Sequence, residues 1–124
     1  MFKKMEELRQ AYLQYLKKDQ ERSPVSQSHY RRVANHFLQF TTVELGYTSP
    51  KEAFKNAEII REYLKSLYRK DLSRPTIQAY FTALRHFCDF LMIKGLAASN
   101  YADMINLDGG IKKPWQDERW NRNE

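Results

Sequence analysis

The sequence has few of the residues that disulfides, metal centres and tight turns require. Its single cysteine, Cys88, cannot form an internal disulfide and is typical of a protein in a reducing cytoplasm. Three histidines and one cysteine without zinc-like spacing predict no metal site. Four glycines and four prolines among 124 residues argue against an all-β protein with many tight turns. These shortages favour a cytoplasmic, helical protein.

Long apolar runs and glycine-rich phosphate loops are also missing. No stretch of about 18 apolar residues is present, which argues against a membrane-spanning helix. The N-terminus, residues 1–6, is charged too regularly for a signal peptide. Because there is no glycine-rich phosphate loop, we expect neither a cofactor nor a small-molecule substrate. The length suits one domain with an independent core.

Positive charge is what the sequence has in excess. Lys and Arg number 21 against 15 Asp and Glu, which gives a net charge of +6 and an isoelectric point near 9.5. This balance favours a polyanionic partner, most commonly nucleic acid and next an anionic membrane surface. Membrane-surface binding would need a basic amphipathic helix with large apolar residues to spare once the core is filled. The sequence contains no such helix, so nucleic acid is the favoured polyanionic partner.

Two stretches of the chain, residues 23–40 and 73–90, repeat the same pattern at a spacing of 50. Each begins with a serine close to a proline, which provides a side-chain cap and a preset φ for a helix start. Two copies are too few for a solenoid, so we expect one compact domain with two equivalent long helices. The identical pairs are Ser23 and Ser73, Tyr30 and Tyr80, His36 and His86, Phe37 and Phe87, and Phe40 and Phe90.

Hydrophobic periodicity predicts an all-α fold, a compact bundle of four to five helices. The expected helices cover residues 3–21, 25–43, 56–70 and 75–94, with a short fifth at 100–107. Gly46 and Gly95 end the second and fourth helices, and Ser49-Pro50 favours a single turn between the second and third. The domain therefore spans residues 1–107, and residues 108–124 are expected to form a flexible tail or linker.

The outward faces of the two repeated helices carry side-chain types that bind DNA. Arg contacts phosphate or guanine, Asn and Gln can read adenine, and Ser, Thr and His donate to phosphates. A polar outer face is also what any surface helix has, and the paired histidines are more readily explained as surface or packing residues than as ligands. Asp89, on the same face, argues against uniform phosphate contact. The candidate DNA-binding residues are Ser28, Arg31, Arg32, Asn35, His36, Gln39, Thr76, Gln78, Thr82, Arg85 and His86.

The order and spacing of these features over roughly residues 5–107 resemble the N-terminal core-binding, SAM-like domain of tyrosine recombinases and phage integrases. The resemblance rests on the run from Ser73 to Tyr80, on the helix ending at 84–91, and on the Lys-Gly-Leu-Ala-Ala-Ser-Asn segment 94–100. Tyr101 stands where the family usually has proline. The resemblance implies that the two equivalent helices cross the major-groove side of double-stranded DNA, which is then the expected partner. The domain would then clamp a recombination half-site during DNA integration and recombination by a phage or mobile element.

The resemblance also implies where catalysis lies. In the family, strand cleavage belongs to a separate C-terminal domain with two Arg, a Lys, a His-x-x-Arg motif and a Tyr nucleophile. That set needs more chain than follows Leu107. Residues 29–32 match His-x-x-Arg literally, but they begin a helix whose Tyr30 faces inward, so we regard the match as coincidence.

We therefore expect no catalytic residues and no enzymatic activity in this chain. The chain would be either a fragment or a natural truncation of a site-specific recombinase. We expect a monomer when no DNA is bound, with any assembly on DNA driven by the full-length recombinase. The alternative is a helical protein-interaction or regulatory module derived from the same fold.

Overall fold

The computed structural model describes residues 4–18, 22–55 and 58–104, and these residues are all-α with no strand. The tail expected at 108–124 and the ends expected at residues 21 and 107 lie outside the described residues. None of the described helices is long and apolar enough to cross a membrane. The elements are α1 (Met5–Lys17), α2 (Pro24–Gln39), the π-helical turn η1 (Phe40–Glu44), α3 (Pro50–Ala53), α4 (Glu58–Arg69), α5 (Arg74–Ile93) and the 3₁₀ turn η2 (Tyr101–Met104).

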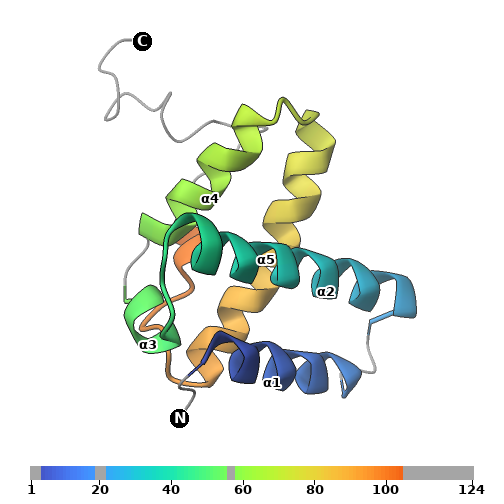
Figure 1. Cartoon of the computed structure of the whole chain (residues 1–124). Helices are drawn as coiled ribbons and strands as arrows, with labels where there is room; N and C mark the ends of the chain where they lie inside the picture. Colours follow the sequence, from blue (N-terminus) through green and yellow to red (C-terminus); the bar gives the residue numbers. More distant parts are fainter. Residues whose placement is uncertain (1–3, 19–21, 56–57, 105–124) are drawn as a thin grey trace.

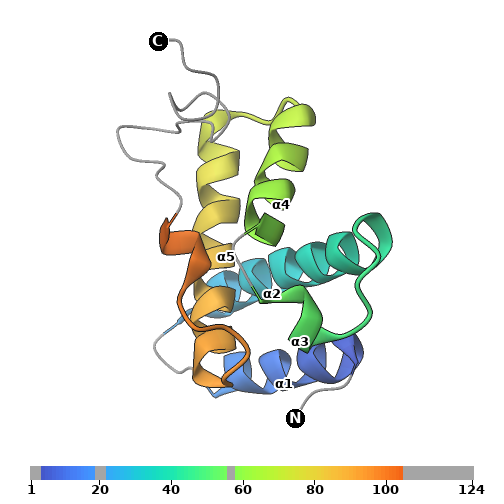
Figure 2. The same cartoon turned by 90° about the vertical axis from the view of Figure 1, so that its left-hand side faces the viewer.

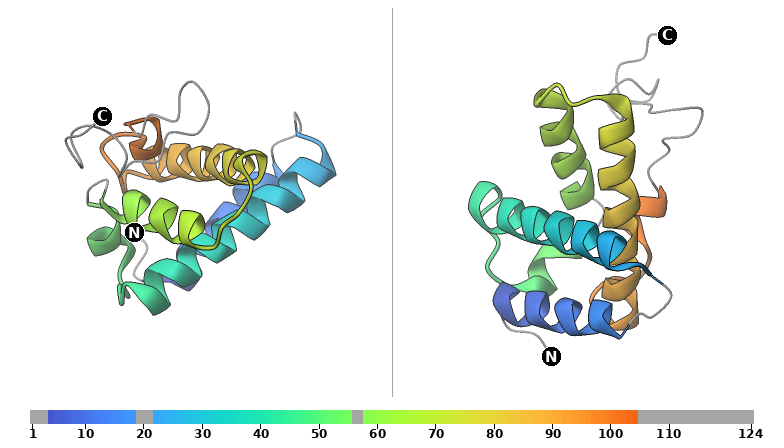
Figure 3. Two further views of the ribbon diagram at one scale, coloured as in Figure 1. Left: turned by 90° about the horizontal axis from the view of Figure 1, so that it is seen from above. Right: turned by 90° about the vertical axis from the view of Figure 1, so that its right-hand side faces the viewer.

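The helices form two antiparallel pairs that cross each other. Helices α1 and α2 run side by side, and α4 and α5 form a second pair that stands across them (Figures 1 and 2). The crossing places α2 directly against α5, while the tips of α4 and α5 project beyond α2 (Figure 3).

Both repeated helices begin as the sequence predicts. The side chains of Ser23 and Ser73 each accept a hydrogen bond from the backbone N–H three residues on, at 3.1 and 3.3 Å. Each helix has a proline in its first positions, where the missing N–H costs nothing. Gly46 and Gly95 follow the two long helices with φ of +79° and +75°, a left-handed conformation that glycine adopts without a Cβ penalty.

The core forms where the two pairs cross. Phe37 of α2 and Phe87 of α5 are fully buried and meet edge to face with ring centroids 5.9 Å apart. Their equivalence in the repeat is therefore also an equivalence in space, as predicted. Cys88 is buried beside them as a small apolar side chain, which is also as expected. Burying each Phe stabilises the fold by about 1.5–3 kcal/mol through the area removed from water.

The end of the second helix differs from the sequence prediction, which continued one α-helix to Val43. Residues 40–44 form a π-helical turn instead, in which the N–H of Leu45 donates to the carbonyl of Phe40 at 3.2 Å. The buried Thr41 hydroxyl donates back to the carbonyl of Phe37 at 2.9 Å, a bond that competes with regular helix geometry. This wide turn brings Phe40, Val43 and Glu44 into the wall of one pocket.

A buried asparagine attaches the segment after α5 to that helix. The Asn100 amide donates to the carbonyl of Arg85 at 3.0 Å and to the Asp89 carboxylate at 2.7 Å. Its oxygen accepts the N–H of Ala102 at 3.0 Å. Asp89 therefore has a structural partner, which accounts for a carboxylate on the outer face of α5.

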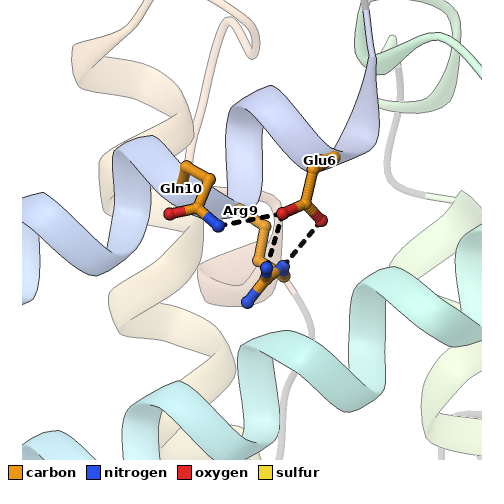
Figure 4. Close-up of polar contacts among 3 residues, drawn as sticks. All are labelled: Glu6, Arg9 and Gln10. Atoms are coloured by element: carbon orange, nitrogen blue, oxygen red, sulfur yellow. Dashed lines mark hydrogen bonds and ion pairs between the residues drawn. The ribbon is translucent and has the colours of Figure 1, made fainter.

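The start of α1 is fixed by a local ion pair (Figure 4). The guanidinium of Arg9 donates to both oxygens of Glu6, and the Gln10 amide donates to one of them at 2.9 Å. The hydrogen bond from Arg9 is the main cause that lowers the pKa of Glu6 to about 2. Both groups of the pair are at the surface, so its contribution to stability is small.

Candidate nucleic-acid interface

The two paired histidines lie at helix junctions rather than on the open outer faces. On one side of the crossing, the His86 ring stacks on Tyr30, with centroids 4.6 Å apart. Its Nδ1 atom lies 2.7 Å from the hydroxyl oxygen of Tyr12 on α1. His86 is therefore a packing residue, which was the preferred explanation from the sequence.

His36 occupies the equivalent place on the other side and carries an additional contact. Its Nδ1 lies 2.7 Å from the Tyr63 hydroxyl oxygen, and Nζ of Lys70 lies 3.3 Å from its Nε2. Because an ammonium group only donates, Nε2 accepts from Lys70, and Nδ1–H donates to Tyr63. Burial, followed by the charge of Lys70, lowers the pKa of His36. The imidazole is therefore held neutral beside a cation.

Three neighbouring pockets that share lining residues lie along one side of α2, and we call them together the α2 groove. Their volumes are about 560, 230 and 400 Å³ from the start of α2 to its end. The first and second share His29 and Arg32, and the second and third share His36. The residues lining it are Pro24, Val25, Ser28, His29, Arg32, Val33, His36, Gln39, Phe40, Val43, Glu44, Ser66, Arg69, Lys70, Ala79 and Tyr80.

Four of the candidate residues on α2 come together in this groove, namely Ser28, Arg32, His36 and Gln39. Arg31 is exposed beside them and donates to the Ser28 hydroxyl at 3.3 Å. Asn35 is half-buried, and its side-chain oxygen has no hydrogen-bond partner within the described part of the chain.

The candidates on α5 do not line the groove. Gln78 and Thr82 are exposed on the outer face, where the Thr82 hydroxyl donates to the carbonyl of Gln78 at 3.0 Å. The Arg85 guanidinium lies over the Phe81 ring, 5.1 Å from its centroid. Thr76 is half-buried at the helix start, where its hydroxyl lies 2.8 Å from that of Ser73. The α5 set is therefore an adjacent surface, separate from the lining of the groove.

Residues 10–95 match the family model for the phage integrase, N-terminal SAM-like domain. The chain belongs to this family. It is 28% identical over 103 residues to the protein named tyrosine recombinase XerC of Halalkalibacterium halodurans, an alignment that covers 83% of this chain and 33% of that protein. The chain thus spans about a third of the length of the curated relative it matches. No solved structure matches it significantly. The family membership expected from the sequence is confirmed.

The SAM-like domain presents two basic residues that the sequence analysis did not select. Arg69 and Lys70 end α4 and reach the groove from the side opposite α2. The signal was a basic pair just before the second copy of the repeat, at residues 69–70. With Arg32 they give the groove three cationic groups, and Glu44 is the one carboxylate in its lining. A concave surface with such an excess concentrates positive potential.

Proposed function

We propose that this chain is a DNA-binding domain of a tyrosine recombinase and holds duplex DNA along α2 and α5 without cleaving it. The observation that carries the proposal is the α2 groove, a row of three pockets lined by Arg32, Arg69 and Lys70 against one carboxylate. The phosphate backbone of a nucleic acid binds such surfaces through charge neutralisation and counterion release. The family and the name of the XerC relative support recombination as the process in which the domain takes part.

The dimensions of α2 suit a duplex. The groove follows the helix from Val25 to Val43, which at 1.5 Å per residue is about 27 Å. An α-helix fits the major groove of B-DNA, which is about 12 Å wide. The exposed Arg31 and the groove-lining Ser28, Arg32 and Gln39 would then reach phosphates and base edges from one helix.

The outer face of α5 would extend this contact. Gln78, Thr82 and Arg85 are exposed on the first three turns of the helix, next to the wall of the groove at Ala79. We assign to this face a supporting contact with the backbone. Affinity would come mainly from phosphate contacts, and sequence preference from the few side chains that reach base edges.

A protein-interaction role is the second candidate, favoured by exposed apolar side chains at the end of α5. Met92 and Ile93 are 42% and 63% exposed, although the rest of the apolar stripe of α5 is buried. Such residues are typical of contact sites between proteins, but two side chains make a small patch. The DNA-binding proposal rests on a larger and chemically more specific surface.

A salt titration of DNA binding tests the proposal and separates it from the alternative. Fluorescence anisotropy with a labelled duplex would compare the unchanged chain with Arg32→Ala/Arg85→Ala and with the matched control Lys17→Ala/Lys18→Ala. We expect affinity to fall steeply with salt. The arginine pair should lower both the affinity and the log–log slope, by about 1 for each phosphate that is no longer bound. If the lysine pair weakens binding as much as the arginine pair, binding is net-charge attraction alone. If no duplex binds at low salt, the proposed function is wrong.

A further inference from the structure

The third pocket of the α2 groove gathers hydrogen-bond donors that the rest of the domain does not use. It lies between the end of α2 and the end of α4 and has a volume of about 400 Å³. Arg69 and Gln39 line it, and both are exposed. Neither side chain forms a hydrogen bond or ion pair with any residue that the structure describes. A guanidinium and an amide that share one pocket and donate to no described residue suit an anionic ligand.

Lys70 is directed to the same pocket by His36. Its Nζ donates to Nε2 of His36 at 3.3 Å, and Tyr63 and the ring of Tyr80 hold the imidazole on its other sides. A carboxylate in the place of His36 would neutralise Lys70, whereas a neutral imidazole positions the ammonium and leaves its charge. Of the three donors on Nζ, one is used by His36, and two are available to a ligand.

The apolar walls of the pocket strengthen its attraction for an anion, whereas its one carboxylate weakens it. Phe40 and Val43 of the π-helical turn form an apolar side, which lowers the local dielectric constant. Glu44 is the one carboxylate in the lining, and it forms no ion pair with a described residue. We infer that this pocket seats one phosphate of a DNA backbone, with Arg69 and Lys70 as its charged contacts and Gln39 as a neutral donor.

The position of the pocket along α2 favours a backbone phosphate as the occupant. Gln39 lies seven residues beyond Arg32, which is about 10 Å along the helix. This length is close to the width of a major groove, about 12 Å, so one helix could contact phosphates on both sides of it. The inference rests on the proposed function, since it names which side chains take a phosphate in the DNA-bound domain.

A second salt titration tests the pocket. The single variants Arg69→Ala and Lys70→Ala would be compared with the double variant, with the charge-preserving Lys70→Arg, and with Lys17→Ala/Lys18→Ala. The altered side chains are exposed, so the fold should persist, and thermal unfolding checks this. We expect the affinity of each single variant to fall roughly 10-fold, as expected when one charged hydrogen bond is removed, and that of the double variant to fall further. Its log–log salt slope should fall by about 1, because both cations hold one phosphate.

The outcomes separate this inference from the proposed function. If Arg69→Ala/Lys70→Ala binds duplex like the unchanged chain while Arg32→Ala/Arg85→Ala is weakened, the pocket is overturned and the DNA-binding proposal stands. If neither pair changes affinity or salt slope, both are wrong. A slope that falls by about 2 indicates two separate phosphates and overturns the single pocket, whereas retained affinity in Lys70→Arg supports it.

Inorganic phosphate distinguishes a backbone phosphate from a small anion. Backbone amide spectra would be recorded with a 20-base-pair duplex and, separately, with millimolar phosphate. We expect both ligands to shift the amides of residues 69 and 70, and neither to do so in the double variant. If phosphate shifts these amides and the duplex does not, the pocket is a small-anion site outside the DNA interface, and the inference is overturned.

Discussion

The hydroxyl oxygen of Tyr12 lies 2.7 Å from Nδ1 of His86, and the same contact at the same distance joins Tyr63 to His36. In each case a tyrosine of one helical pair bonds the repeat histidine of the other pair. The ring contacts are also reciprocal, because Tyr30 stacks on His86 and Tyr80 meets His36 edge to face. The two helical pairs are therefore equivalent, and each contributes a tyrosine that contacts a histidine of the other pair where α2 and α5 cross.

This relationship extends the internal repeat to the helices that precede α2 and α5. Tyr12 and Tyr63 are 51 residues apart, one more than the spacing within the long helices. Both side chains are fully buried, and each hydroxyl contacts a histidine. Burial raises the pKa of each hydroxyl above its usual range. The other equivalent residues are Leu8 with Ile59 and Leu16 with Leu67, all of them buried.

Removing either tyrosine hydroxyl should destabilise the domain by similar amounts. Tyr12→Phe and Tyr63→Phe each leave a half-buried histidine nitrogen without its partner, which costs about 1–3 kcal/mol. Urea unfolding followed by circular dichroism measures the change. Tyr47→Phe is the matched control, because Tyr47 is 39% exposed, and it should change stability by less than about 0.5 kcal/mol. Equal destabilisation in all three variants would refute a specific role for the Tyr–His contacts.

Truncating the two crossing phenylalanines should cost more. Phe37→Ala and Phe87→Ala each open a cavity at the centre of the core, and we expect the free energy of unfolding to fall by about 3–5 kcal/mol. Chemical denaturation provides the measurement, with Val25→Ala as the exposed control. A decrease below about 1 kcal/mol in either variant would contradict the packing of these two rings against each other.

Asn100→Ala should loosen the segment after α5 without unfolding the bundle. The substitution removes the hydrogen bonds of Asn100 with the Arg85 carbonyl, the Asp89 carboxylate and the Ala102 N–H, and we expect a cost of about 1–3 kcal/mol. Hydrogen exchange should accelerate at the Ala102 amide, while the amides of buried α5 residues near the crossing stay protected. Ser99→Ala, at an exposed neighbouring position, is the control. Unchanged exchange at Ala102 would show that the observed network does not hold this segment.

Stability should decrease as the pH falls below about 6.5, the ordinary pKa of histidine. Burial and the charge of Lys70 lower the pKa of His36 in the folded domain, so the unfolded chain binds its proton more readily. Stability associated with His36 is therefore complete above pH 6.5 and decreases between that pH and the lower folded pKa. Urea unfolding at several pH values, compared with His36→Gln, measures this difference. We expect the stability of the unchanged chain relative to His36→Gln to grow as the pH rises to about 6.5, and a relative stability that grows as the pH falls would contradict the direction of the shift.

Much of the fold follows from local features of the sequence. The serine–proline starts, the glycine stops and the apolar spacing define the two long helices, because capping and periodicity depend on neighbours within a few turns. The π-helical end of α2 was not predicted, since the buried bond of Thr41 to the Phe37 carbonyl depends on what covers that turn. Within the described residues, the fifth helix is a 3₁₀ turn at Tyr101–Met104, whose Ala102 N–H donates to the Asn100 side chain.

The candidate DNA-binding residues could be predicted only as positions on a helix face. A 3.6-residue period identifies an outward direction, and Arg31, Arg32 and Gln39 are indeed exposed there. The same pattern could not show that His36 and His86 are half-buried, because their tyrosine partners come from α4 and α1. Nor could it bring Arg69 and Lys70 to the side of α2, which requires the two helical pairs to cross.

The sequence by itself determined the all-α class, the repeated helices and the family, because these depend on local capping, periodicity and short motifs. The tertiary structure alone decided which residues line the α2 groove. Crossing two antiparallel pairs leaves the end of α4 beside the end of α2, so Lys70 meets His36 although 34 residues separate them. Such contacts depend on the angle and order in which helices pack. The hydrophobic periodicity of a single helix predicts which face is buried but does not predict that angle.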